Sequence, residues 1–227
     1  MSANQRAGVV LMAYGTPSTP DQILPYYTDI RRGRPPTGEQ LADLTRRYEA
    51  IGGLSPLTRR TEEQRDAVQR CLDLLDPERY TVTLGFKHVS PSIEEAVDTL
   101  AADGISRIVG AVLAPHYSAY SVGQYIERLD TAAASHAVET ASVTSWATLP
   151  AFVDFLADEL GGRLAAMPDR TRVVFTAHSL PTRIVETGDP YPAELRATAE
   201  AVANRLALAE GEHWEIAWQS AGRTPEP

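Results

Sequence analysis

Short apolar, β-branched segments alternate with amphipathic helical patterns along most of the chain, and this alternation constrains the fold most strongly. The predicted strands are Gly8–Ala13, Thr81–Phe86, Arg107–Ala114, Glu139–Ser145, Arg172–Ala177 and Glu215–Gln219. The predicted helices lie at Asp21–Arg31, Glu39–Ile51, Glu62–Leu75, Ser92–Ala102, Val122–Ala134, Ala151–Ala166 and Ala193–Leu208. Because a helix between two strands carries the chain back across the sheet, the pattern predicts an α/β fold with mostly parallel sheets covered by helices.

Several predicted helices carry signals at their ends. The predicted starts are Thr37 with Gln40 and Thr61 with Gln64, both at capping-box spacing, and Ser90 as a cap before Pro91. The pair Gly52-Gly53 and the single Gly104 predict helix ends. We expect two domains, residues 1–141 and residues 142–227, because one alternating unit ends and another begins near Thr140–Pro150. The second unit stops soon after a strand, so we expect it to be incomplete.

Charge and composition exclude several classes of protein. The net charge of −9 argues against nucleic-acid binding, which requires a basic face. Cys71 is the only cysteine, so neither an intrachain disulfide nor an iron–sulfur cluster with several cysteine ligands is expected. The sequence has no apolar N-terminal signal and no run of about 18 apolar residues, so we expect a cytoplasmic protein without an integral membrane segment.

Polar residues follow most of the predicted strands. The relevant pairs are Tyr14-Gly15, Lys87-His88, His116-Tyr117, His178-Ser179 and Gln219-Ser220. In open parallel sheets, binding sites form at the carboxyl ends of the strands, so these side chains are candidates for a site. A histidine at a strand end often only binds a neighbouring carbonyl, which is the structural alternative for His88 and His116. For His178 a functional role is favoured, because the tight turn that directly follows its apolar strand would present the imidazole at a cleft.

A basic segment stands out in this acidic chain. Between Arg31 and Arg60 there are seven arginines and three acidic residues, and Lys87 is the only lysine of the whole chain. Part of such a run is a solvated surface, but guanidinium groups also bind carboxylates through two parallel hydrogen bonds. The motifs of nucleotide cradles, hydrolase nucleophile elbows and zinc proteases do not occur in the sequence. The residues alone therefore predict an α/β protein with a cleft that binds an anion and contains His and Tyr.

A set of longer motifs carries a resemblance to a known family. The motifs are LMAYGTP (11–17), YYTDIRRGR (26–34), RRYEAIGGLSPL (46–57), GFKHVSPSIEEAV (85–97), VLAPHYSAYSVGQY (112–125), FTAHSLP (175–181), GDPYP (188–192) and WQSAGRTPEP (218–227). Together they resemble the ferrochelatases, specifically the short soluble form that acts on coproporphyrin III. The resemblance implies two Rossmann-like units of the class II chelatase type, each with a parallel sheet flanked by helices.

The resemblance also implies roles for individual residues. His178 is similar to the histidine that faces the porphyrin nitrogens and serves as iron ligand or proton acceptor, while Tyr14 resembles the tyrosine on the opposite side of the macrocycle. The positions implied to bind the propionates and line the pocket are Arg31, Arg47, Tyr48, Ser55 and Tyr125. Lys87 and His88 match a motif near the cleft. Ferrous iron is implied as a substrate, without any prosthetic group.

The expected activity is insertion of Fe²⁺ into coproporphyrin III, with protoporphyrin IX as the close alternative and a monomer as the expected state. The family's metal-side histidine works with a glutamate beyond the TPEPW-like segment, which starts at Thr224 here. The sequence stops at Pro227 and does not reach that glutamate. We therefore expect a truncated chain that binds porphyrin but turns over slowly or not at all. A porphyrin-binding or haem-binding remnant, and more weakly a cobalt chelatase for sirohydrochlorin, remain alternatives.

Overall fold

The computed structural model describes residues 6–181 and 183–220 and divides the chain into two compact units. The first unit runs to Leu113 and includes Gln124–Val143. The second unit takes Ala114–Gly123 and the described residues from Thr144 onward. The predicted boundary at residues 141 and 142 treats the domains as consecutive, whereas each compact unit is assembled from two separate pieces of the chain.

The first unit is built on a parallel sheet of four strands in the order β2-β1-β3-β4. Its strands are β1 (Ala7–Ala13), β2 (Tyr80–Phe86), β3 (Arg107–Val112) and β4 (Glu139–Val143). Strand β1 bonds to neighbours on both sides, and every residue from Gly8 to Ala13 is buried. This explains why its sequence is an uninterrupted apolar run rather than an alternating one.

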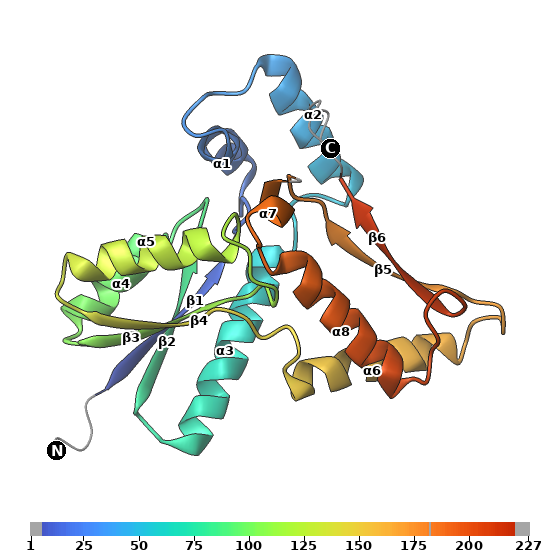
Figure 1. Cartoon of the computed structure of the whole chain (residues 1–227). Coiled ribbons are helices and arrows are strands. Elements are labelled where there is room, and N and C mark those ends of the chain that lie inside the picture. Colours follow the sequence, from blue (N-terminus) through green and yellow to red (C-terminus); the bar gives the residue numbers. More distant parts are fainter. Residues whose placement is uncertain (1–5, 182, 221–227) are drawn as a thin grey trace. The chain divides into compact units, whose positions relative to one another are not determined.

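Helices cover both faces of this sheet (Figure 1). Helix α3 (Leu57–Leu75) packs Val68 and Leu72 against the face that presents Leu11 and Leu84. Helices α4 (Ile93–Ala102) and α5 (Val122–Ala134) cover the opposite face. Before α3 come a 3₁₀ turn, η1 (Pro20–Gln22), and two helices, α1 (Ile23–Ile30) and α2 (Gly38–Ala50).

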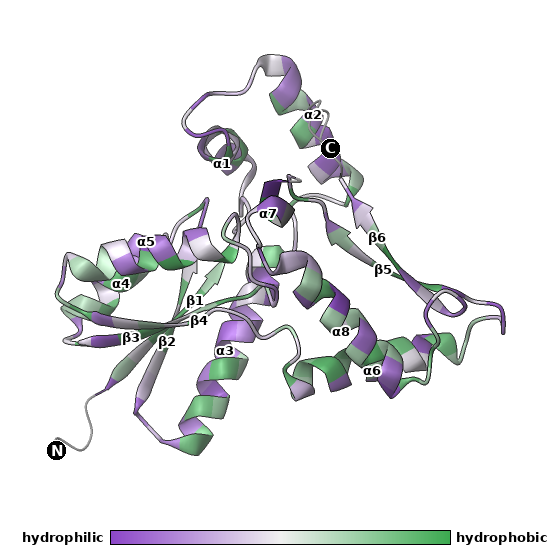
Figure 2. Cartoon of the chain, viewed as in Figure 1, coloured by the Kyte–Doolittle hydropathy of each residue, from purple (hydrophilic) through white to green (hydrophobic). Residues whose placement is uncertain are grey.

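The second unit contains a parallel sheet of two strands, β5 (Val173–His178) and β6 (Trp214–Gln219). Helix α6 (Pro150–Leu164) packs against α8 (Tyr191–Arg205) through Val153, Ala157 and Val202. The short helix α7 (Arg183–Glu186) follows β5. Colouring by hydropathy shows apolar residues along much of α6, whereas α8 alternates more (Figure 2). The α/β class with parallel sheets flanked by helices is therefore confirmed.

The predicted helix starts were correct in one case and wrong in two. Thr37 and Gln40 form the predicted capping box at the start of α2. Thr61 lies inside α3, which begins at Leu57, and its hydroxyl donates to the Leu57 carbonyl oxygen at 2.8 Å. Helix α4 is capped by Ser92 with Glu95 rather than by Ser90. The Ser90 hydroxyl instead donates to a Glu95 carboxylate oxygen at 2.9 Å, and the Ser92 N–H donates to the same oxygen at 2.6 Å.

None of the helices in residues 6–181 and 183–220 is long and apolar enough to cross a membrane.

Close packing of α4 on β2 gives the first testable prediction. A methyl group at Gly85 would lie 2.9 Å from the Ile93 backbone Cα, a contact that requires the helix to shift. We expect Gly85→Ala to lower the free energy of unfolding by about 1–3 kcal/mol, as overpacked cores do. Gly162→Ala is the matched control, because no atom lies within 4 Å of its added methyl group and alanine favours helix. Urea denaturation gives the unfolding midpoint of each variant. Equal shifts of the two midpoints would contradict the packing argument.

Candidate functional site

Three aromatic rings gather at the carboxyl edge of the first sheet. The β1–β2 pairing continues one step past the strands, because the backbone N–H groups of Lys87 and His88 donate to the carbonyl oxygens of Ala13 and Tyr14 at 2.9 and 3.2 Å. The Tyr14 and His88 rings consequently lie side by side, with centroids 4.4 Å apart. Tyr26 stands edge-on to both, with centroid distances of 6.5 and 6.4 Å. The parallel register therefore brings Tyr14 and His88 together, and α1 adds Tyr26.

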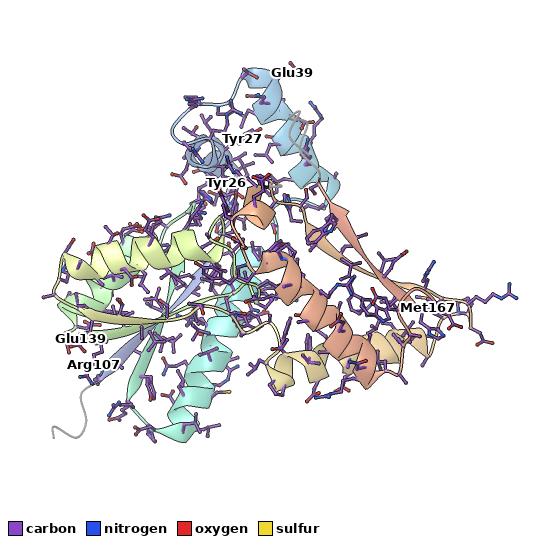
Figure 3. All side chains as sticks on the ribbon, in the orientation of Figure 1. Tyr26, Tyr27, Glu39, Arg107, Glu139 and Met167 are labelled. Carbon is purple, nitrogen blue, oxygen red and sulfur yellow. The ribbon has the colours of Figure 1, made fainter. Side chains whose placement is uncertain are left out.

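A pocket of about 570 Å³ opens beside the aromatic cluster. Its walls come from the loop after β1, from α1, and from the segment between β2 and α4. The lining residues are Ser18, Gln22, Pro25, Tyr26, Asp29, Thr58, Lys87, His88, Val89, Ser90, Ser92, Glu95 and Arg128. Figure 3 labels Tyr26 and the neighbouring Tyr27 on α1. The pocket is within the size range of small-molecule sites and combines aromatic walls with charged groups.

His88 is held in the pocket by a carboxylate. Its Nδ1 lies 2.6 Å from an Asp29 oxygen, and only 13% of its side chain is exposed. Burial lowers the pKa of His88 below 6.5, although the bond to Asp29 opposes part of that shift. Since the folded-state pKa is lowered, the stability that this group contributes is fully present above pH 6.5 and is lost as the pH falls through the lowered value. At neutral pH the imidazole is therefore uncharged.

Burial also keeps the phenols of the site protonated. It is the largest cause that raises the pKa of Tyr14, Tyr26 and Tyr125 above 10.0. Tyr125 on α5 is 5% exposed, and the Lys87 ammonium lies 4.9 Å from its ring centroid. Burial lowers the pKa of Lys87, whose Nζ donates to the Gln124 side chain at 2.6 Å. Burial thus disfavours charge on Lys87 and on the three phenols.

Arg128 organises this part of the site, and sequence analysis did not identify it. Its guanidinium holds both oxygens of Glu94, at 2.8 and 2.6 Å, and donates to the Lys87 carbonyl at 2.7 Å. The bond to Arg128 is the main reason why the pKa of Glu94 is lowered. No local sequence pattern marks this ion pair, since Glu94 and Arg128 lie 34 residues apart in different helices.

The predicted propionate-binding residues lie in the first unit, on or beside α1, α2 and the start of α3. Arg31 ends α1; it donates Nε to the Arg34 carbonyl at 3.2 Å, and its guanidinium lies 5.6 Å from the Tyr27 ring centroid. Arg47 on α2 is 75% exposed and pairs with Asp43 at 2.6 Å. The hydroxyl groups of Tyr48 and Thr16 are 3.1 Å apart. The Ser55 hydroxyl accepts the Leu57 N–H at 3.2 Å, where α3 begins.

His178 is the last residue of β5 in the second unit. Its Nδ1 lies 2.7 Å from the carbonyl oxygen of Ser179, which can only accept a hydrogen bond, so Nδ1 must carry the proton. Nε2 is therefore the ring nitrogen that is free to act as a ligand or proton acceptor, and the side chain is exposed. Metal-binding histidines are commonly oriented by a bond of this kind. In residues 6–181 and 183–220, no three His, Cys, Asp or Glu side chains gather as a ready metal site.

His116 lies in the second unit and has a structural role, the alternative to a functional one that the sequence left open. Its Nε2 lies 2.9 Å from the Thr198 hydroxyl, which donates to the Ala147 carbonyl at 2.7 Å. The structure brings together Tyr14, His88 and Tyr26 in the first unit, whereas His178 belongs to the second. The expectation that Tyr14 and His178 face the same macrocycle stays a prediction, as do the individual site roles. The last matched motif extends into residues 221–227, outside the described residues.

Comparison with known proteins agrees with the resemblance in the sequence. A family model described as Ferrochelatase matches residues 6–227. The coproporphyrin III ferrochelatase of Geobacillus kaustophilus is 45% identical, with the match covering 97% of this chain and 71% of that protein. The corresponding protein of Halalkalibacterium halodurans is 42% identical over 98% of this chain and 72% of its own length. A ferrochelatase of Herpetosiphon aurantiacus is 41% identical over 98% and 74%.

The bond between Asp29 and His88 gives a prediction that can be measured without substrate. Because the carboxylate raises the pKa of His88 against the effect of burial, we expect Asp29→Asn to lower that pKa further. Titration of the His88 ring protons by NMR measures the shift. Asp98→Asn is the control, since it removes the carboxylate that bonds to His136 at 2.7 Å and should leave His88 unchanged. A raised pKa of His88 in Asp29→Asn would rule out the assigned role of the carboxylate.

Proposed function

The chain belongs to the ferrochelatase family, and on this basis we propose that it inserts ferrous iron into coproporphyrin III. The reaction replaces two pyrrole N–H protons by Fe²⁺ and yields coproheme for haem synthesis. Iron enters as a substrate, and we expect that no prosthetic group is needed. Protoporphyrin IX is the alternative substrate. A cytoplasmic location and a monomeric state stay predictions.

The aromatic cluster of Tyr14, Tyr26 and His88 is the observation that best supports this proposal. A porphyrin is a large flat π-system, and aromatic side chains bind such surfaces by stacked or edge-to-face contacts. The phenols are neutral at pH 7, since burial raises their pKa further above 10.0, and His88 is neutral because its pKa is lowered below 6.5. Three uncharged rings suit the uncharged face of the macrocycle, since these rings do not have to give up the hydration of an ion when it binds.

Arginines supply the contacts for the charged edge of the substrate. Coproporphyrin III carries four propionates, and guanidinium groups bind carboxylates with two parallel hydrogen bonds. We assign this task to Arg31 and Arg47, assisted by Tyr48 and Ser55, and we assign Tyr125 to contact with the macrocycle. Binding energy at the propionates can then hold the ring distorted, so that the pyrrole lone pairs turn toward the iron. Four carboxylates match the arginine-rich segment better than the two of protoporphyrin IX do.

His178 is the group that we assign to the metal side. With Nδ1 committed to the Ser179 carbonyl at 2.7 Å, the Nε2 lone pair can take one pyrrole proton or bind the entering iron. The sequence comparison alone implied the role, and the hydrogen bond adds the reason why Nε2 is the reactive nitrogen. Tyr14, protonated at neutral pH, is assigned to the other side of the macrocycle.

The direct test follows iron insertion into coproporphyrin III by absorbance under anaerobic conditions. We expect the wild-type chain to bind coproporphyrin III and to convert it to coproheme only slowly, and His178→Ala to lower that rate at least about tenfold, since a positioned acid–base group contributes about 10²–10⁴-fold. His136→Ala is the control, because His136 lies on the surface and bonds to Asp98. Tight porphyrin binding without any conversion would instead support a porphyrin-binding protein without turnover.

The two arginines are expected to differ in their effect on binding. Arg47 already pairs with Asp43, whereas no ion pair of Arg31 with a carboxylate is found in the described part of the chain. We therefore expect Arg31→Ala to weaken coproporphyrin III binding by about 1.5–3 kcal/mol, and Arg47→Ala by less. Fluorescence titration gives both dissociation constants, with Arg163→Ala on α6 as a surface control. Equal affinity of wild type and Arg31→Ala would remove Arg31 from the propionate site.

A further inference from the structure

The GDPYP motif (188–192) matches the family, yet the function proposed above gives it no task. It forms the start of α8 in the second unit, where Tyr191 is the first helical residue. The Tyr191 hydroxyl donates to the carbonyl oxygen of His178 at 3.3 Å. Among the described residues, Tyr191 is the side chain that hydrogen-bonds to the main-chain carbonyl of the metal-side histidine.

Contacts on two sides fix the ring of Tyr191. The His116 ring stands edge-on to it at a centroid distance of 6.3 Å, and the Trp218 ring lies at 6.2 Å. The phenol is the donor in its bond to His178, because a main-chain carbonyl oxygen can only accept a hydrogen bond.

Asp189 ties the same segment to the loop 114–123. One carboxylate oxygen accepts the Ser118 hydroxyl at 3.0 Å and the Ala119 N–H at 2.9 Å, while the other accepts the Tyr191 N–H at 3.0 Å. Ser118 is fully buried. Three donors therefore converge on one side chain, and an asparagine, with a single acceptor oxygen, cannot satisfy all of them.

The backbone after His178 is held independently by β6. The Ser179 N–H donates to the Gln219 carbonyl at 2.8 Å, and the Ser179 carbonyl accepts Nδ1 of His178. Tyr191 and β6 thus hold the same peptide unit, the one that joins His178 to Ser179, through its carbonyl oxygen and its N–H group. The direction of the imidazole depends on both, because the ring bonds to the very next carbonyl.

We propose that Tyr191 and Asp189 are positioning residues for iron insertion, which hold the main chain of His178 so that its Nδ1–H stays on the Ser179 carbonyl and its Nε2 is presented to iron or to a pyrrole proton. The proposal rests on the proposed function only for the identity of the substrate. Neither residue contacts substrate in this assignment; both act through His178.

The experiment uses the whole chain with Tyr191→Phe, which keeps the ring and removes the hydroxyl. We expect kcat for Fe²⁺ insertion into coproporphyrin III to fall about tenfold, the effect of one lost hydrogen bond, with KM for the porphyrin unchanged within about twofold. Tyr117→Phe is the matched control, because its hydroxyl makes no hydrogen bond in the described residues of the second unit. Asp189→Asn should lower kcat at least as much as Tyr191→Phe and also lower Tm.

A second measurement does not depend on activity. ¹⁵N NMR of the His178 ring should show a protonated Nδ1 and an unprotonated Nε2 in the wild type and in Tyr117→Phe, and exchange-averaged shifts in Tyr191→Phe. An unchanged His178 spectrum in Tyr191→Phe would overturn the proposal, and so would a raised KM at constant kcat. If the wild type inserts no iron, the proposed function fails, and the NMR comparison still decides whether Tyr191 positions His178.

Discussion

The pairing of β1 with its two neighbours is the interaction on which the first unit depends. β1 bonds to β2 on one side and to β3 on the other in parallel register, and both of its faces are buried. Because parallel strands end at the same edge, the residues just past β1 and β2 meet there without any further device. The two additional bonds from Lys87 and His88 to Ala13 and Tyr14 extend the ladder into the site. The geometry of the cluster is thus a continuation of the core.

Some of the elements that build this arrangement could be predicted from the sequence, and others could not. Strands rich in β-branched residues and the Thr37 capping box were predictable, since local pattern determines them. Thr61 and Ser90 were misassigned because serine and threonine also bond to helix carbonyls and neighbouring carboxylates, and Leu57 and Ser92 made the better helix starts. The start of a helix is a competition between nearby candidates, and capping spacing alone does not decide it.

The site residues show the same distinction. Tyr14, Lys87 and His88 could be placed at strand ends from the sequence, and the structure brings them to one edge. Asp29 and Arg128 could not be identified, because their partners lie 59 and 34 residues away and no local pattern marks such pairs. The loop 114–123 follows β3 of the first unit but belongs to the second, since Asp189 and Glu194 hold its backbone N–H groups. Two carboxylates far along the chain decide that outcome.

Burial in the first unit determines which side chains of the site favour their neutral form. The same desolvation that raises the pKa of Tyr14, Tyr26 and Tyr125 lowers the pKa of Lys87 and His88, so every one of these groups is pushed toward its neutral form. Arg47 lies in solvent with 75% of its side chain exposed, where a full charge costs little. A ligand with a neutral aromatic centre and anionic arms has this same division of polarity. A ligand with a charged centre would lose its hydration against the rings of Tyr14, Tyr26 and His88, so these rings favour a ligand whose charges lie at its edge.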